Sequence, residues 1–427
     1  MTLCMISDIT YAASGDSTSS SHAALEDVHV KFQSLLLDDI LPVWSTVGVD
    51  VVRGGFCETI ATNWSIPRGL RRIRVTARQV YAFCIAAELG WNCNAAAACV
   101  RHGSRFLEQY SSEDGLLSHV LADDGAVEGE HDLYDQAFLL LSYAHSYKML
   151  NDEIFIRRGK DLLSSVRRHF YNRAGGFIDA TNNPYPLRSN PHMHLLESAL
   201  AWAAVDPSDV WRDFADELVT LFKAKFFDDQ LGFVRESFGR DWEAIAEHDR
   251  YRVEPGHNFE WAWLLLRWEE ITGGDCGDRP HRLVKFAETY GYDKTRHVAV
   301  NEVWSDGASS DGNARLWPQT ERLKAWLALA EMREGEAREL AEACALDAAE
   351  TLLRYISTDA KGLWHDVMDE DGRFRSGPAP ASSLYHIACA LAELARYVAS
   401  PSPHTLIGDS QSRRYVHGEI ASLQSEL

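Results

Sequence analysis

The chain has 427 residues, a hydrophobic content of 46% and a formal net charge of −21 at pH 7. This length and apolar content allow a large buried core. The negative charge argues against nucleic acid or an anionic membrane as the main partner. It also disfavours a highly phosphorylated substrate, unless a local basic pocket overrides the global balance.

The N-terminal residues carry no export signal. Residues 1–22 lack a basic region followed by a long apolar run, so we expect no signal peptide. The serine-rich run 14–21 predicts a flexible leader over residues 1–23. No apolar segment is long enough to span a bilayer, and the eight cysteines show no C-x-x-C spacing. We therefore expect reduced thiols and a cytoplasmic protein.

Apolar residues recur at helical spacing along most of the chain, with short breaks. The predicted helices span residues 25–46, 74–90, 94–111, 131–149, 153–170, 192–204, 208–226, 254–272, 280–291, 317–333, 336–356 and 381–399. Twelve helices make six pairs.

A glycine followed by an aromatic residue or leucine recurs between the helix pairs. The segments are Gly54-Gly55-Phe56, Gly115-Leu116-Leu117, Gly175-Gly176-Phe177, Gly232-Phe233 and Gly362-Leu363-Trp364, with Val303-Trp304 at the one place where the glycine is missing. Their spacing of about sixty residues indicates a repeat architecture. Six hairpins bury their apolar faces best when they close into a ring. We predict an all-α (α/α)6 barrel, or toroid, with short β-turn segments between the pairs. This catalytic domain spans residues 24–400, and a tail follows at 401–427.

Polar residues collect on alternate helices, mostly in their first turns. They are Arg78 on the second helix, Asp135 and Gln136 on the fourth, His194 and Glu197 on the sixth, His257 and Glu260 on the eighth, Glu321 on the tenth and His386 on the twelfth. In a toroid these helices would form the inner layer and open toward one end.

The segment around His257 is the most informative. Pro255 and Gly256 fix the start of a helix there, so His257 and Glu260 share one face of its first turn. His194 and Glu197 repeat this spacing. An imidazole beside a carboxylate suits acid–base chemistry, and an unperturbed imidazole, near pKa 6.5, needs no large shift to act as a base. The alternative is that each histidine only caps or packs a helix start.

Six motifs occur in order along the chain. They are Val75-Thr76-Ala77-Arg78-Gln79, Asp132-Leu133-Tyr134-Asp135-Gln136-Ala137-Phe138, Asn190-Pro191-His192-Met193-His194-Leu195-Leu196-Glu197, Val253-Glu254-Pro255-Gly256-His257, Arg315-Leu316-Trp317-Pro318-Gln319-Thr320-Glu321 and Pro380-Ala381-Ser382-Ser383-Leu384-Tyr385-His386. Together they resemble the N-acylglucosamine 2-epimerase superfamily, which includes cellobiose 2-epimerases, mannose isomerases and sulfoquinovose isomerases. The Arg315–Glu321 motif resembles the isomerase branch.

The resemblance implies proton transfer on an aldose without a metal or another cofactor. It implies that His257 moves the proton between carbons with support from Glu260, and that His386 opens the sugar ring or protonates oxygen. The substrate-binding residues would be Arg78, His194, Glu197, Trp317, Glu321 and Gln136.

We therefore expect an isomerase that interconverts D-mannose and D-fructose through a cis-enediol, with D-lyxose and D-xylulose as a side reaction. The alternatives are a sugar 2-epimerase, a glycoside hydrolase on the same architecture, and a non-catalytic sugar-binding protein. A metal held by both His-x-x-Glu pairs is a further alternative. The expected partner is a monosaccharide, and the sequence leaves the oligomeric state open, with a homodimer as one option.

Overall fold

The computed structural model of the chain describes residues 21–182 and 184–400. The expected tail therefore lies outside the described residues, as does most of the expected leader. Residues 21–23 of that leader already belong to the first helix, Ser21–Ser34.

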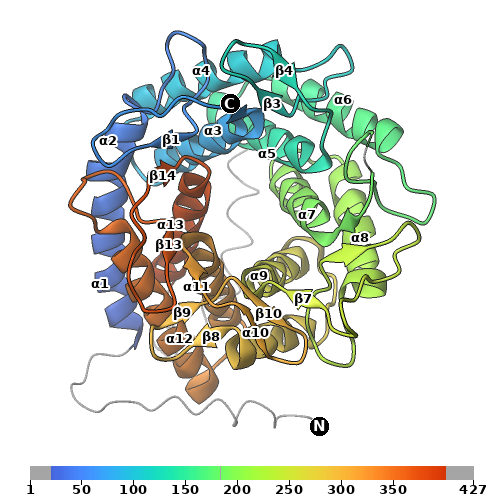
Figure 1. Ribbon diagram of the computed structural model, residues 1–427, viewed down its shortest axis with the longest axis vertical. Helices are drawn as coiled ribbons and strands as arrows, with labels where there is room; N and C mark the ends of the chain where they lie inside the picture. Colours follow the sequence, from blue (N-terminus) through green and yellow to red (C-terminus); the bar gives the residue numbers. More distant parts are fainter. Residues whose placement is uncertain (1–20, 183, 401–427) are drawn as a thin grey trace, which may run out of the picture.

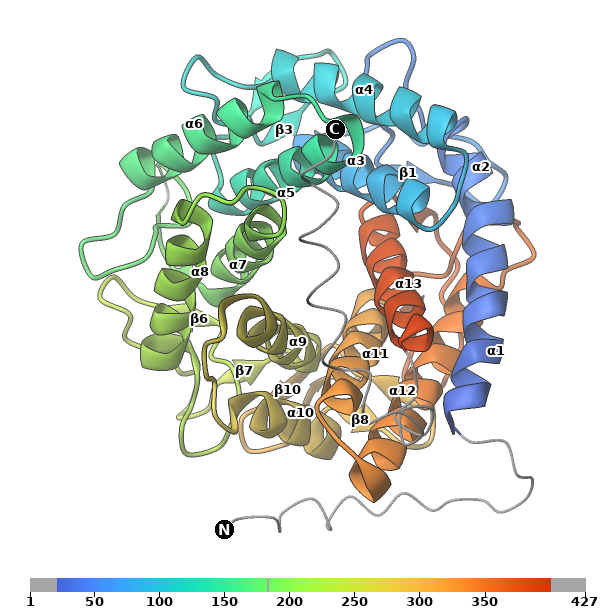
Figure 2. The same ribbon diagram turned by 180° about the vertical axis from the view of Figure 1, so that it is seen from behind.

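The helices form two concentric rings, seen end-on in Figure 1 and from behind in Figure 2. The inner ring consists of α3 (Ile73–Glu88), α5 (Leu133–Leu150), α7 (Ser189–Ala203), α9 (Pro255–Thr272), α11 (Leu316–Glu331) and α13 (Ser383–Ala399). The outer ring consists of α1 (Ser21–Ser34) with α2 (Leu41–Trp44), α4 (Cys93–Gln109), α6 (Ile154–His169), α8 (Val210–Leu221), α10 (Arg279–Tyr290) and α12 (Gly335–Ile356). Each inner helix packs against the next, and α13 packs against α3. The predicted (α/α)6 barrel is confirmed.

Two outer-ring helices continue through a wider π-helical turn. The turn Leu35–Ile40 joins α1 to α2, and Phe222–Phe226 extends α8. The sequence-based ranges 25–46 and 208–226 each correspond to such a combined element.

The composition of the helices explains which layer each one occupies. Inner helix α9 is buried along almost its whole length, whereas outer helix α6 buries one stripe that includes Phe155, Leu162 and Val166. A helix that is apolar on all sides belongs in an interior, while an amphipathic helix covers it.

Short antiparallel strands lie in the connections between the helices, and several of them pair one helical hairpin with the next. The pairs are β2 (Arg71–Arg72) with β3 (Val120–Leu121) and β3 with β4 (Val127–Glu128), β5 (Leu187–Arg188) with β6 (Ser237–Phe238), β7 (Arg252–Val253) with β10 (Glu302–Trp304) and β10 with β11 (Ser309–Asp311), β8 (Tyr292–Asp293) with β9 (Val298–Ala299), and β12 (Ala314–Arg315) with β13 (Val367–Met368). The pair β1 (Thr59–Ile60) and β14 (Ala379–Pro380) joins the first and last repeats and so closes the ring.

The glycine-containing segments are tight turns that are clamped by side chains of the inner helices. Gly55 has a φ of +68°, and a Cβ there would lie 2.8 Å from the hydroxyl of Thr76, so only glycine fits. Five inner helices carry a side chain, four residues after their N-cap, that accepts a hydrogen bond from the backbone N–H of such a turn. These side chains are Thr76, Gln136, His192, Asn258 and Gln319.

In the fifth repeat the expected position of the turn was wrong. The clamp of Gln319 contacts Ala299, whereas Val303 and Trp304 belong to strand β10. His297 adopts a φ of 59° two residues before Ala299 and takes the place of the glycine. A motif search for glycine misses this turn because a non-glycine residue occupies the left-handed conformation.

Among the described residues, no helix is long and apolar enough to cross a membrane. The seven cysteines in this part of the chain are all free thiols, and only Cys93 is exposed.

Candidate active site

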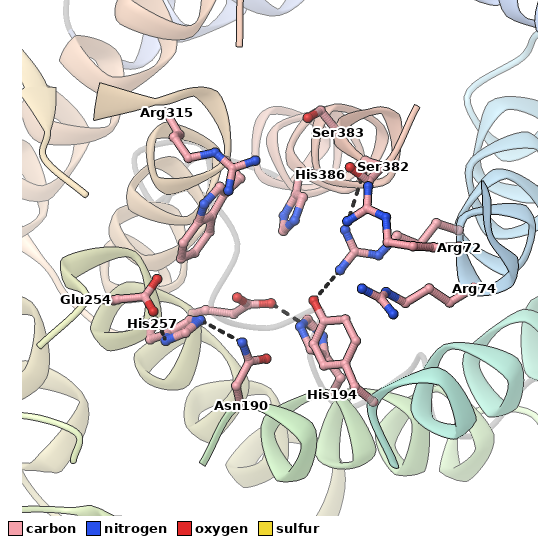
Figure 3. A pocket seen from close by; sticks show the side chains of 14 residues that line it. Arg72, Arg74, Asn190, His194, Glu254, His257, Arg315, Ser382, Ser383 and His386 are labelled. Carbon is pink, nitrogen blue, oxygen red and sulfur yellow. Dashed lines mark hydrogen bonds and ion pairs between the residues drawn. The ribbon is translucent and has the colours of Figure 1, made fainter. Parts of the chain in front are cut away.

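The six inner helices begin at the same end of the ring, around a cavity of about 170 Å³ (Figure 3). Their N-cap residues are Arg72, Asp132, Arg188, Glu254, Arg315 and Ser382. Residues two and six positions after a cap share one helix face, and this face lines the cavity in several repeats. Examples are Arg74 and Arg78 on α3, and Asn190 and His194 on α7.

The cavity brings together six of the nine residues expected from the sequence. Arg78, His194, His257, Glu260, Trp317 and His386 line it. Glu197, Glu321 and Gln136 do not belong to the lining, so the expectation that these three side chains contact the substrate is corrected below.

His257 is held by a carboxylate that the sequence analysis did not identify. Its Nδ1 lies 3.0 Å from Oε2 of Glu236 and 3.8 Å from Oε1 of Glu254. Glu260 makes no hydrogen bond to His257, but its charge is among those that raise the pKa of this imidazole. Residue 260 is six positions after the helix cap and lines the cavity, while the side chain of residue 257 contacts Glu236 of the neighbouring hairpin.

The charge of His257 also differs from expectation. Burial lowers its pKa, but the carboxylates of Glu236 and Glu254 outweigh burial and raise the pKa to about 10. The imidazole is therefore protonated at neutral pH, and the expected unshifted pKa is wrong.

Asn190 contacts the other ring nitrogen of His257. Its Nδ2 lies 3.1 Å from Nε2, and its Oδ1 is buried without a hydrogen-bond partner. A charged imidazole donates from Nε2, so the amide oxygen must face it in that state, which a half-turn of the amide achieves. Asn190 can thus satisfy both protonation states of His257.

His386 also packs against Trp317. The Trp317 ring centre lies 5.2 Å from the ring of His257 and 5.8 Å from the ring of His386. Nδ1 of His386 bonds to Oε1 of Glu321 at 2.9 Å, while its Nε2 makes no hydrogen bond to any described residue. Burial lowers the pKa of His386 to about 4, and the charges of Arg78 and Lys324 act in the same direction, so the ring is neutral.

Glu321 lies behind His386 and is fully buried. Nζ of Lys324 lies 2.5 Å from its carboxylate. Burial raises the pKa of the Glu321 carboxyl, but the charge of Lys324 and the hydrogen bond from His386 lower this pKa to about 2. Glu321 is therefore an ionised anchor that holds Nδ1–H of His386 and turns Nε2 toward the cavity.

Glu197 holds Nδ1 of His194 in the way that Glu321 holds Nδ1 of His386. Its Oε2 lies 3.0 Å from Nδ1 of His194, and the hydroxyl of Tyr385 donates to it at 2.5 Å. Burial lowers the pKa of His194 to about 4, so this ring is neutral as well. Glu260, 3.8 Å from Nδ1 of His194, completes this side. Burial and the nearby Glu321 carboxylate raise the pKa of Glu260.

Arg78 is a buried cation without a carboxylate partner. Its Nη1 donates to the carbonyl of Ser382 at 3.2 Å, its Nη2 donates to the hydroxyl of Tyr134, and its Nε is unpaired. The guanidinium lies 4.0 Å from the ring centre of Phe138. A fixed, uncompensated cation at a cavity can stabilise negative charge that develops on a ligand.

Gln136 is a clamp of the fold rather than a ligand of the cavity. Its amide bonds to the N–H and the carbonyl of Leu117 and to the carbonyl of Asp132. Position 136 is two residues after Tyr134, which lines the cavity, and so lies about 200° from it around the helix. That rotation turns it away from the cavity.

The sequence contains a signal for Glu236 that motif reading missed. In each of the five repeats with such a clamp, one turn residue donates its backbone N–H to a side chain of an inner helix. In four of them, the side chain two residues further along accepts a hydrogen bond from the backbone N–H of a helix N-cap residue. The pairs are Glu58 with Arg72, Asp179 with Arg188, Glu236 with Glu254, and Asn301 with Arg315. Aligning the repeats on their glycines and reading on for four residues finds this position.

Two groups of side chains could hold a metal ion. They are His194 with Glu197 and Glu260, and Glu236 with Glu254 and His257. The expected alternative combined both His-x-x-Glu pairs in one site, whereas the structure distributes them over two. In each group the histidine Nδ1 already bonds to a carboxylate.

Comparison with known proteins shows the family. The model of the N-acylglucosamine 2-epimerase family matches residues 54–390. The chain is 38% identical over 377 residues to a protein named mannose-6-phosphate isomerase from Rhizobium meliloti, which covers 86% of this chain and 97% of that protein. It is 22% identical to a D-mannose isomerase from Marinomonas mediterranea over 67% of this chain and 76% of that protein.

Solved structures show the same fold. A D-mannose isomerase aligns with a TM-score of 0.75 at 19% identity and covers 91% of this chain and all of that one. Cellobiose 2-epimerase from Bacillus thermoamylovorans aligns with a TM-score of 0.75 at 20% identity and covers 87% of this chain and all of that one. This chain therefore belongs to the N-acylglucosamine 2-epimerase family and is a carbohydrate isomerase or epimerase.

Proposed function

We propose that the protein is an aldose–ketose isomerase that interconverts a mannose-configured aldose and the corresponding ketose, with D-mannose and D-fructose as the simplest pair. The observation that carries this proposal is the opposite charge of two imidazoles on one cavity. His257 is protonated and His386 is neutral, so one ring can donate a proton while the other accepts one. The names of the relatives as isomerases support the same choice.

The first step opens the sugar ring. His257 donates its proton to the ring oxygen while Nε2 of His386 accepts the proton of the anomeric hydroxyl. The bond between C1 and the ring oxygen breaks and leaves the open-chain aldehyde. His257 is then neutral and His386 is charged.

The second step moves the proton between carbons. Neutral His257 removes the proton from C2, and His386 returns its proton to the carbonyl oxygen at C1, which gives the enediol. His257 then delivers the proton to C1 while His386 takes the proton of the C2 hydroxyl, so the ketose forms. Closing the ketose ring reverses the first step and restores the resting charges.

Other side chains would stabilise and orient the sugar. Arg78 would stabilise the negative charge that develops on the C1 and C2 oxygens. Its own charge is available for this because its hydrogen-bond partners in the described chain, Ser382 and Tyr134, are neutral. Glu260 and His194 offer hydrogen-bond partners to hydroxyl groups, and Trp317 contacts both acid–base rings. Neither step draws on a cofactor.

A 2-epimerase is the second candidate. Epimerisation needs acid–base groups on both faces of the enediol, and the cavity lining contains two such groups, His257 and His386. The Arg315–Glu321 motif favours the isomerase.

Turnover of mannose in heavy water tests the choice. We expect fructose as the main product, carrying solvent deuterium at C1. Glucose with deuterium at C2 would identify an epimerase instead, and failure to convert any member of an aldose panel would contradict both candidates.

A further inference from the structure

Arginines surround one side of the cavity, where Arg72 and Arg74 lie at the start of α3 (Figure 3). A carboxylate holds each of them by one edge. Nε of Arg72 donates to Glu58 at 2.6 Å, and Nη1 of Arg74 donates to Asp135 at 2.7 Å. Nη1 of Arg72 and both Nε and Nη2 of Arg74 make no hydrogen bond within the described chain. A carboxylate thus fixes the position of each guanidinium, and the remaining N–H groups are available to bind a ligand.

The positive charge on this side is not fully compensated. Asp135 faces Arg74 and also His119, whose Nδ1 lies 2.6 Å from it and whose pKa it raises. Arg78, next along the helix face, has no carboxylate at all. The cavity lining contains four arginines and two acidic side chains, Glu254 and Glu260. A chain with a net charge of −21 therefore encloses a cationic cavity.

The reaction alone does not account for this charge. An enediolate carries a single negative charge close to C1 and C2, and Arg78 together with the charged imidazole of the His257–His386 pair can meet it. Arg72 and Arg74 remain, at the cavity rim. Two fixed guanidinium edges are suited to bidentate recognition of a tetrahedral oxyanion.

We propose that the free edges of Arg72 and Arg74 bind an oxyanion carried by the substrate, a phosphate monoester at the end of the sugar remote from C1 and C2. The hydroxyl of Ser382, which also lines the cavity and makes no hydrogen bond to the described chain, adds a neutral donor. The orientation of the sugar rests on the proposed function, but the binding of the anion does not require turnover.

The experiment separates binding from catalysis by using sugars that cannot react. Calorimetry measures the dissociation constants of mannitol and mannitol 1-phosphate, and kcat/KM is measured in parallel for mannose, mannose 6-phosphate and mannose 6-sulfate. We expect the phosphate to improve binding by about 10-fold or more, which corresponds to one charge-assisted hydrogen bond. The sulfate ester, with one negative charge, should fall between mannose and the phosphate.

Substitutions assign the effect to residues. Arg72→Gln and Arg74→Gln should each remove most of the phosphate preference and change the binding of mannitol by less than about 2-fold. Arg188→Gln is the matched control. Arg188 occupies the same cap position on α7 and is held by Asp179 in the same way, but it does not line the cavity. It should keep the preference.

Three results would overturn the proposal: equal binding of mannitol and its phosphate, a preference that survives both substitutions, or a preference lost only in Arg315→Gln, on another side of the rim. Isomerisation of mannose without any preference for phosphate would leave the proposed function intact and reject the anion site. Arginine-dependent binding of mannitol 1-phosphate without conversion of any aldose would do the reverse.

Discussion

Nδ1 of His257 lies 3.0 Å from a carboxylate oxygen of Glu236, a residue of the neighbouring hairpin. Together with Glu254, this carboxylate raises the pKa of His257 to about 10 against the effect of burial. The protonated form is the one that can open the sugar ring, so the proposed enzyme is competent below this pKa and loses activity as the pH rises through it.

Glu236→Gln should therefore move the alkaline limb of kcat/KM to lower pH. Removing the carboxylate leaves burial as the dominant influence, and burial lowers the pKa of an imidazole. The pH profile of kcat/KM reports the free enzyme and is the measurement to make. Glu217→Gln, at an exposed carboxylate paired with Arg167, should leave the limb in place. An unchanged limb in Glu236→Gln would show that another group titrates there.

His257→Asn and His386→Gln should each reduce kcat by about 10²–10⁴-fold, the usual effect of losing a positioned acid–base group. The two variants should differ on an open-chain substrate analogue. His386→Gln should recover part of its activity there because ring opening is bypassed, while His257→Asn should not. Equal losses on cyclic and open-chain substrates would rule out a ring-opening role for His386. Circular dichroism of both variants checks that the fold is intact.

The sequence was sufficient to predict the ring of six hairpins, and six of the nine expected site residues line one cavity at the starts of alternate helices. Periodicity and repeat spacing depend on local pattern, and the sequence contains that pattern directly. It did not predict the partner of each histidine. Glu260 was expected beside His257 because the two are close in sequence, whereas Glu236 reaches it from another hairpin. The protonation states follow from such contacts, so they could not be predicted either.

Gln136 illustrates the same limit on a single helix turn. Asp135, Gln136 and His257 all fall in first turns, but only the rotation about the helix axis decides which side chain meets the cavity. Reading the repeats against each other shows that position 136 matches Gln319 and Asn258, which are clamps.

Gln136→Ala should destabilise the protein without changing its affinity for sugar. The substitution leaves the buried N–H of Leu117 without its partner, at a cost of about 1–3 kcal/mol, while the carbonyl of Leu117 keeps its contact with His131. Thermal unfolding should show a lower Tm, while KM stays near that of the unmodified enzyme at a temperature where the variant is folded. A raised KM with an unchanged Tm would restore the substrate-binding role expected from the sequence.

Activity should survive treatment with a strong chelator. In both candidate metal groups the histidine Nδ1 is already hydrogen-bonded to a carboxylate, an arrangement that orients an imidazole for acid–base work. Assays before and after incubation with EDTA, with metal content measured in parallel, test this expectation. Loss of turnover on chelation and recovery on adding one divalent cation would assign a metal to one of the two groups.

Lys324 should determine how far activity extends into acid. It is fully buried, and its Nζ lies 2.5 Å from Glu321, whose pKa it helps to lower to about 2. An ionised Glu321 holds Nδ1–H of His386, so the alignment of that ring persists until the pH falls toward the pKa values of these two groups, about 2 and about 4. Lys324→Met removes the cation while keeping an unbranched apolar side chain of similar length. The pKa of Glu321 should then rise, because burial favours the neutral carboxyl, and the acid limb of kcat/KM should move to higher pH.

Lys148→Met, at an exposed lysine paired with Glu88, should leave the profile unchanged. Because a buried substitution can lower stability, Tm is recorded for both variants, and Lys324→Gln repeats the test with a polar side chain. An acid limb that stays in place in folded Lys324→Met and Lys324→Gln would show that Lys324 does not act on His386 through Glu321.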